Sequence, residues 1–435
     1  MAGESLAVAY RRPSELVGSL LSLQTAGLHP RFFTGFLTAA RPAAVCLTVL
    51  ADVAAADFRP EYTGYLRDPV VTCGGDRLRF EVLSGCCGVY ARLDVLPEAL
   101  DGEIHARGTT NVDINPELYR ALSRIGGKDP LRLSVGPDDL TVTTLDAHIV
   151  EKKVPLPSRW LRGLAEAGFI ASGLDPRAEL TGAAAASLLQ RMPPRPNRDV
   201  RWLVPAGRSV RLATGATPAA VCLPGPHRVA VLRPLLPMTR LVRLYGPPAT
   251  PGSPPFPSGW ELELPGVRFS LLLSPGVDRG LSGEGALLTR LDEAEQLADR
   301  LGWDGTVDPD LIAQANGMTT EQVRGALAAL AMSGKVGYDW ADAAYFHREL
   351  PLRPELIADL NPRLVAARAL VAAGAVHPGP AGTSVGDYLV HETAGGELGC
   401  TCRWWVEHRG TRGPCKHVLA VTLTRAVRLT GKEDT

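Results

Sequence analysis

The sequence predicts a multi-domain α+β protein, and three features support this prediction. The chain has 435 residues, enough for two to four domains of ordinary size. Hydrophobic residues make up 45% of it and charged residues 21%, as in soluble globular proteins that bury sizeable cores. Helical spacings and short alternating strands follow one another along the chain, with no repeat of fixed period. We therefore expect a string of small modules.

Three segments are expected in the N-terminal half. Residues 1–57 are predicted to be helical, because apolar residues recur there at helical spacings, namely Leu16, Leu20 and Leu21, and Phe32, Phe33 and Phe36. Residues 58–157 form an α+β module with strands such as LRFEVL and a helix that begins at Asn115-Pro116. Asn can cap the free amides of a helix, and Pro suits its first turn. Residues 158–194 are predicted to be a helical connector.

Four segments are expected in the C-terminal half. Residues 195–290 are a second β-rich module with many arginines, and residues 291–351 contain helix, turn, helix and hairpin. Residues 352–383 are predicted to be a helix and the linker HPGPAGTS, before a closing module over residues 384–435. Changes in hydrophobic period and runs of Pro and Gly set these boundaries.

Membrane insertion and secretion are not expected. The longest apolar run, residues 43–56, contains Asp52 and is shorter than the ~20 residues that a transmembrane helix needs. The first ten residues, MAGESLAVAY, lack the basic and apolar regions of a secretory signal. We therefore expect a cytoplasmic protein, in which the eight cysteines are thiols or metal ligands.

The segment CTCRWWVEHRGTRGPCKH carries the clearest chemical motif. It places Cys400-x-Cys402 twelve residues before Cys415-x-His417. Zn²⁺ prefers four Cys or His ligands in a tetrahedron, and two such pairs form a closed, structural site. An exchange of one ligand for His391 or His408 is an alternative. We expect a hairpin before the motif, a helix after it, and a metal that supplies much of the folding free energy.

This motif resembles the SWIM-type zinc finger, whose pattern is Cys-x-Cys, a variable loop, then Cys-x-His leading into a helix. The resemblance covers residues 384–430 and is strongest over Gly413-Pro-Cys-Lys-His-Val-Leu-Ala420. It implies a C-terminal ββα zinc finger. The position of the finger behind a large region resembles bacterial SWIM proteins found with MoxR-type ATPases and von Willebrand A domain proteins, which implies partners of that kind.

Residues 311–336 resemble a helix-turn-helix, and the sequence after them can form the two-stranded wing of a winged helix. Thr319 and Gln322 are spaced as a capping box. Between residues 306 and 350, three basic side chains face six acidic ones, whereas a DNA-binding surface needs positive charge. We therefore expect a protein-contact or structural role. The outer positions of the second helix would be Glu321, Gln322, Arg324, Gly325 and Ala328.

The opposite charge is found between residues 195 and 246, where nine arginines face a single acid, Asp199. Guanidinium groups bind phosphate and carboxylate, so this segment is a candidate surface for a polyanion or an acidic partner. Alternatively, these arginines only fill the solvent side of strands. The candidate partner-binding residues are Arg208, Arg211, Arg240 and Arg243.

No catalytic motif is recognisable, since the chain lacks a phosphate-binding loop, a zinc-protease helix motif and a nucleophile elbow. The leading hypothesis is a non-catalytic zinc protein that binds a protein or a nucleic acid, as part of a larger assembly. The alternative is an enzyme with its site in residues 58–157. A cleft that holds Asp113 with His105 or His148 would favour that alternative.

Overall fold

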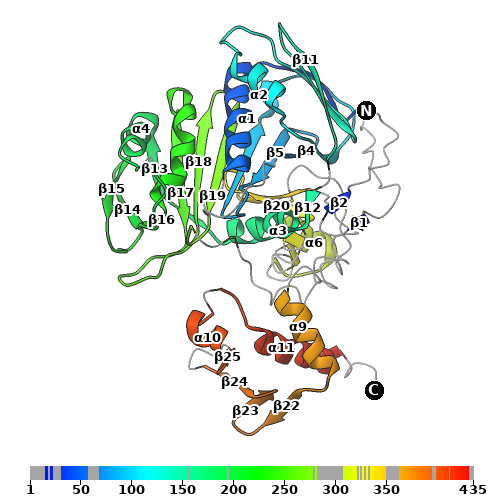
Figure 1. The fold of residues 1–435 in the computed structure, drawn as a ribbon, viewed down its shortest axis with the longest axis vertical. Coiled ribbons are helices and arrows are strands. Elements are labelled where there is room, and N and C mark those ends of the chain that lie inside the picture. The colour runs from blue at the N-terminus through cyan, green and yellow to red at the C-terminus, as the bar shows by residue number, and fades with distance from the viewer. Residues whose placement is uncertain are drawn as a thin grey trace.

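Figure 1 shows a computed structural model of the chain. A large body of sheets and helices lies above a small C-terminal module, drawn in orange and red. Among the helices that the structure describes, none is long and apolar enough to cross a membrane. The residues described are 15–17, 20–22, 31–56, 68–154, 156–193, 195–277, 280–281, 307–320, 323, 326–327, 330–331, 334–348, 362–393, 398–410 and 412–430.

An eight-stranded antiparallel sheet forms the centre of the body. β6 and β19 pair along their whole lengths, so the sheet runs without a break across the two segments predicted as separate β-rich modules. The expected division of residues 58–157 from residues 195–290 is therefore absent from the sheet. In spatial order the strands are β13 (Asp175–Thr181), β17 (Leu241–Gly246), β18 (Ser258–Leu264), β19 (Val267–Leu273), β6 (Val89–Val95), β5 (Leu78–Leu83), β4 (Val70–Cys73) and β8 (Gly108–Asn111).

A second, five-stranded sheet corrects the prediction of a helical N-terminus. Phe33–Leu37 form strand β3, in which Phe33, Gly35 and Leu37 are buried and Phe36 is exposed. This alternation has a period of two, and the apparent helical spacing of the phenylalanines was a coincidence. Two further short strands, β1 (Glu15–Val17) and β2 (Leu20–Ser22), also fall within residues 1–57 and pair with each other. The sheet contains, in order, β11 (His148–Lys152), β10 (Asp139–Thr143), β9 (Arg132–Val135), β3 and β7 (Leu100–Ile104).

A structural repeat links these two sheets, although none is visible in the sequence. β3 is followed by helix α1 (Ala40–Ala55) and the strands β4, β5 and β6; β8 is followed by α2 (Pro116–Ser123) and β9, β10 and β11. Each leading strand pairs with a strand of the other unit, β3 with β9 and β8 with β4. The predicted cap of α2 is confirmed, because Asn115 Oδ1 accepts hydrogen bonds from the amides of Glu117 and Leu118, both at 2.8 Å.

The predicted helical connector contains a strand. Helices α3 (Ser158–Ser172) and α4 (Gly182–Gln190) flank β13, which pairs with β17 at the edge of the large sheet. A partner more than fifty residues away in the sequence therefore decides the conformation of this segment. The strands β14 (Val200–Ala206), β15 (Ser209–Ala213) and β16 (Val221–Pro224) form a small separate sheet, followed by the 3-10 helix η2 (Pro226–Met238).

The segment predicted as a winged helix contributes helix α6 (Pro309–Asn316) and a hairpin, β20 (Val336–Asp339) with β21 (Ala344–His347). Asp339 and Trp340, which lead into the turn of this hairpin, are buried against the body, whereas residues 341–343 at its tip are exposed. Trp340 stacks on Tyr245 at 4.9 Å between ring centres and donates its Nε1–H to the carbonyl of Ala171 at 3.0 Å. The predicted outer positions Glu321, Gln322, Arg324, Gly325 and Ala328 lie outside the described residues.

Buried charges hold this hairpin on the sheet. The carboxylate of Asp339 lies 3.0 Å from Arg268 Nη2 and 3.3 Å from Arg92 Nη2. Burial alone would raise the pKa of Asp339, but the charges of Arg92 and Arg268 outweigh it and lower the pKa to about 2. Because the hairpin is fixed to the body at Asp339 and Trp340, it is not a free wing.

The C-terminal module is larger than predicted. The segment HPGPAGTS, expected to be a linker, forms most of the strands β22 (Val376–Gly379) and β23 (Gly382–Val385). These pair with the expected hairpin of β24 (Tyr388–Glu392) and β25 (Leu398–Cys400), and they complete a four-stranded sheet. The helices of the module are α9 (Pro362–Ala372), α10 (Arg403–His408) and α11 (Lys416–Thr430).

Candidate metal centre

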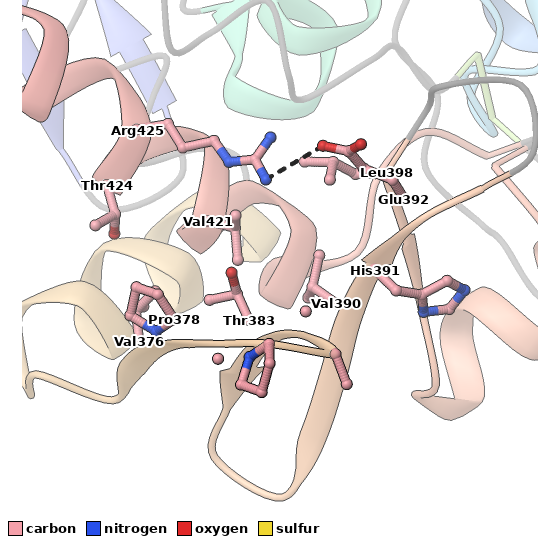
Figure 2. Close-up of a pocket in the computed structure, with 14 residues that line it drawn as sticks. Val376, Pro378, Thr383, Val390, His391, Glu392, Leu398, Val421, Thr424 and Arg425 are labelled. Atoms are coloured by element: carbon pink, nitrogen blue, oxygen red, sulfur yellow. Dashed lines mark ion pairs between the residues drawn. The ribbon is translucent and has the colours of Figure 1, made fainter.

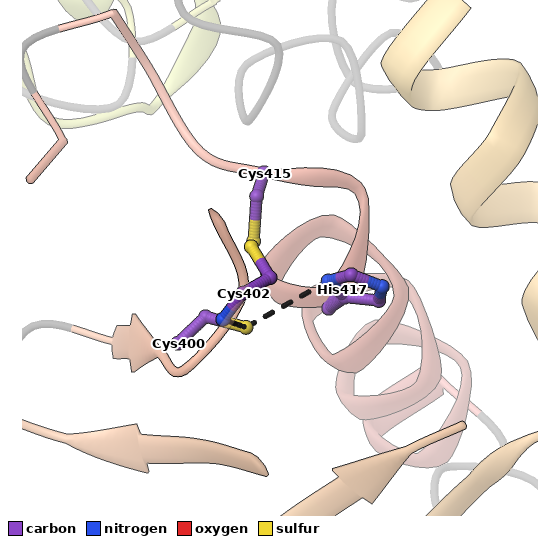
Figure 3. Close-up of side chains that lie close together, drawn as sticks. All are labelled: Cys400, Cys402, Cys415 and His417. Atoms are coloured by element: carbon purple, nitrogen blue, oxygen red, sulfur yellow. Dashed lines mark hydrogen bonds between the residues drawn. The ribbon is translucent and has the colours of Figure 1, made fainter. Parts of the chain in front are cut away.

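Three elements of the C-terminal module, β25, α10 and α11, bring the predicted ligands together (Figure 3). Cys400 ends strand β25, and Cys402 caps the N-terminus of α10. The carbonyl of Cys415 accepts the first helical hydrogen bond of α11 from Leu419, so Cys415 stands at that helix's N-terminus. His417 lies in its first turn. One strand end and three helix-start positions thus point at one centre.

The geometry of the cluster fits a zinc ion. One ligand atom from each of the four residues lies within 4.8 Å of the others, and all four residues are buried. Cys400 Sγ is 3.7 Å from His417 Nδ1. Zn–S bonds of about 2.3 Å require sulfur atoms about 3.8 Å apart in a tetrahedron, so only small shifts would close the site around the ion. Three sulfurs and one imidazole nitrogen are also the donors that zinc prefers.

The local electrostatics favour a thiolate at Cys415. A hydrogen bond from the Cys400 thiol lowers the pKa of Cys415 to about 5, despite the opposing effect of burial. The amide of Val418 also donates to this sulfur at 3.4 Å. The same thiol bond raises the pKa of Cys400, which acts as the donor. A thiolate at a helix N-terminus is a ready metal ligand.

Residues 391–426 match the SWIM zinc finger family. The match covers the two ligand pairs and most of the helix that follows them. Together with the buried Cys₃His cluster, it identifies zinc as the cofactor of this module. No curated protein matches the chain.

Two solved structures show a distant similarity to part of this chain. The proliferating cellular nuclear antigen of Entamoeba histolytica is 10% identical, with a TM-score of 0.39 over 56% of this chain and 98% of its own. The PCNA2–PCNA3 complex of Sulfolobus tokodaii is also 10% identical, with a TM-score of 0.41 over 55% of this chain and 98% of the matched one. TM-scores of this size do not establish a shared fold.

The alternative ligands are placed elsewhere in the SWIM finger. The ring of His408 packs edge-on against Trp404, with 4.5 Å between ring centres. His391, on β24, lines a pocket of the same module (Figure 2). Neither histidine belongs to the cluster of four.

The pocket lies between the sheet of the SWIM finger and helix α11 and has a volume of about 470 Å³. Apolar side chains form much of its lining, among them Val376, Val390 and Val421. Arg425 Nη2 and Glu392 Oε1, 3.6 Å apart, form an ion pair at its mouth (Figure 2). Both side chains are more than half exposed, so this ion pair contributes little to stability.

The structure divides the predicted arginine surface. Arg208 and Arg243 both lie 3.6 Å from the carboxylate of Glu179 on β13. Arg243 also pairs with Glu261 at 3.2 Å and Glu263 at 3.6 Å, both on β18. The net charge counted over residues 195–246 thus overstates the surface charge, because acids from other strands lie beside these arginines. Arg211 and Arg240 are exposed.

The residues named for an enzyme site do not converge. His105 follows β7 and His148 begins β11, and these strands are opposite edges of the five-stranded sheet. His148 Nδ1 lies 3.0 Å from the hydroxyl of Thr143, and His105 lies 3.7 Å from Glu103. Burial raises the pKa of the Glu151 carboxyl to about 7, and the negative charge of Asp113 adds to this rise.

Two side chains that support the metal centre were missed in the sequence. Arg363 on α9 and Trp404 on α10 hydrogen-bond to the loop before Cys415. Trp404 carried a signal, because it stands between the two ligand pairs. Arg363 carried none, since it lies in the segment predicted to be outside the finger.

Proposed function

We propose that this chain is a non-catalytic, cytoplasmic zinc protein whose SWIM finger binds a protein partner within a larger assembly. The closed metal site carries the proposal. Four buried protein ligands fill the tetrahedron of zinc, whereas catalytic zinc sites keep one position for water or substrate. The metal then stabilises the module, and the surface of the module is left to bind.

A surface on helix α10 supports a protein partner. This helix lies between the two ligand pairs and exposes Val406 (63%), flanked by the charged side chains of Arg403 and Glu407. Protein contact sites likewise have an apolar centre with a polar rim. The pocket of about 470 Å³ in the same module, lined by both polar and apolar side chains, offers a second surface for contact.

Nucleic acid is the second candidate partner, and its support is weaker. Arg211 and Arg240 are exposed, and Lys416 on α11 adds a positive charge from the finger. Against this, glutamates pair with Arg208 and Arg243. Trp340 also holds the β20–β21 hairpin on the body, so the hairpin is not free to act as the wing of a DNA-binding winged helix.

The identity of the partner rests on resemblance alone. Bacterial proteins with a SWIM finger behind a large region suggest a MoxR-type ATPase or a von Willebrand A domain protein. The absence of catalysis is likewise a proposal. Within the described residues, His105 and His148 lie at opposite sheet edges and so lend no support to an active site in residues 58–157.

The test is affinity purification of the full chain from its native cells, followed by rebinding of the captured partner in purified form. Val406→Asp should abolish binding of the specific protein partner, while the variant keeps one zinc per chain. Val365→Asp, at a position 42% exposed on α9, is the matched control and should still bind the partner. If both variants capture and rebind the same proteins as the wild type, α10 is not the contact surface and the proposal is wrong.

A further inference from the structure

Arg363 on α9 lies outside the segment that matches the SWIM family, yet it contacts the loop that carries a zinc ligand. Its Nη1 donates hydrogen bonds to the carbonyl oxygens of Arg412 at 2.7 Å and Pro414 at 2.8 Å. Cys415 follows directly in the chain. Arg363 thus binds the carbonyl groups on both sides of Gly413, just before the ligand Cys415.

Trp404 completes this arrangement. Its Nε1–H donates to the carbonyl of Gly413 at 3.3 Å, so the three consecutive carbonyls of residues 412–414 all accept a side-chain hydrogen bond. The guanidinium of Arg363 also lies over the Trp404 ring, with Cζ 4.8 Å from the ring centre. Gly413 has φ +71°, a conformation that favours glycine, so the turn has one defined shape.

Helix α9 connects this loop to the body of the protein. The next residue, Leu364, is fully buried in the main hydrophobic core, whereas Ala367, one turn later, is buried in the core of the finger. Burial lowers the pKa of Arg363, and the buried carboxylate of Glu166 on α3 of the body opposes that shift. The helix that fixes the ligand loop is itself anchored in both parts.

We infer that Arg363 is a positioning residue for the zinc ligand Cys415. By fixing the carbonyls of residues 412 and 414, it sets the place of the Cys415 sulfur before the metal binds. Metal affinity commonly falls by about 10- to 100-fold when a group that orients a metal ligand is removed. The inference does not depend on the identity of any partner.

The chemistry of the side chain makes a graded test possible. Methionine keeps the unbranched stem of Arg363 but supplies no donor. Lysine keeps the charge and can donate to both carbonyls, but it cannot lay a planar group on Trp404. Positioning by hydrogen bonds therefore predicts that Arg363→Lys restores part of what Arg363→Met loses.

The experiment uses the full chain, with zinc affinity measured by competition with a chromophoric chelator. We expect Arg363→Met to raise the dissociation constant for zinc by about 10- to 100-fold and Arg363→Lys to fall between it and the wild type. Arg368→Met on the same helix is the control and should bind zinc as the wild type does. Cobalt substitution gives a spectroscopic readout, because its visible bands report the tetrahedral geometry, and these bands should weaken only in the Arg363 variants.

Three outcomes would overturn the inference. The first is wild-type zinc affinity with an unchanged cobalt spectrum in Arg363→Met. The second is an equal loss in Arg368→Met, which would mean that any change in α9 destabilises the finger. The third is a zinc affinity of Arg363→Lys no higher than that of Arg363→Met. If Arg363→Met does not fold, the comparison of Arg363→Lys with the wild type and with Arg368→Met still decides.

Discussion

Arg348, at the end of strand β21, donates from Nη1 to the carboxylate of Glu81 on β5 at 2.5 Å, across 267 residues of sequence. Both side chains are almost fully buried. Arg348 also donates to the carbonyls of Gly334, Leu164 and Val336, so its guanidinium joins the hairpin, helix α3 and the large sheet. This contact makes the segment predicted as a winged helix an integral part of the body.

Breaking this pair should destabilise the body strongly. Glu81→Ala leaves the Arg348 charge buried without its carboxylate, so we expect a loss of about 3 to 5 kcal/mol in the free energy of unfolding, measured by urea denaturation. The control is Glu407→Ala, which breaks the exposed pair with Arg403 and should cost less than about 1 kcal/mol. Equal effects of the two variants would show that the buried pair does not hold the hairpin.

Replacement of Cys415 with Ser should remove the metal and unfold the finger, because structural zinc supplies about 10 kcal/mol or more of folding free energy in such modules. Elemental analysis should find one zinc per wild-type chain and none in the variant. Cys222→Ser, a buried cysteine of the body, is the control and should keep the metal. Wild-type protein purified without chelators and free of zinc would contradict this prediction.

Glu151 should make the stability of the body depend on pH. Burial raises its pKa in the folded protein from 4.5 to about 7, so its protonated form is the one that the fold favours. The stability that this group contributes is complete below pH 4.5 and is lost as the pH rises towards 7. Glu151→Gln should therefore raise the unfolding free energy by about 2 to 3 kcal/mol at pH 8 and by less than about 1 kcal/mol at pH 5.

Glu103→Gln is the control for this pH dependence, because Glu103 is 83% exposed on strand β7. Its effect should stay within about 0.5 kcal/mol at both pH values. A Glu151→Gln variant whose stability follows that of the wild type from pH 5 to pH 8 would mean that Glu151 titrates as an exposed carboxyl does.

The arginine surface can be tested with single- and double-stranded nucleic acid. If the partner is a nucleic acid, changing Arg208, Arg211, Arg240 and Arg243 together to Gln should weaken binding equally for all sequences and flatten its dependence on salt, by up to about four phosphate contacts. Arg324→Gln should change little. Sequence preference lost through Arg324 alone would make the helix-turn-helix a base reader after all, and no binding at low salt by the intact chain would favour the protein partner.

Local spacing was sufficient to predict the ligand set. Two residues that lie two apart, each at the end of a strand or the start of a helix, are placed by short-range geometry, so Cys400 and Cys402, or Cys415 and His417, converge whatever the body does. The cap at Asn115, the hairpin before Cys400 and the helix after His417 are local in the same sense. Their hydrogen bonds join residues within a few positions of one another.

Tertiary structure alone decided which segments share a sheet and which charges are buried. β6 and β19 pair although more than 170 residues separate them, and Phe33–Leu37 became a strand because β7 and β9 offered it partners on both sides. The +8 counted along residues 195–246 was offset by glutamates from β13 and β18. Strand pairing and ion pairing depend on which surfaces meet in space, and hydrophobic periodicity along one segment carries no information about that partner.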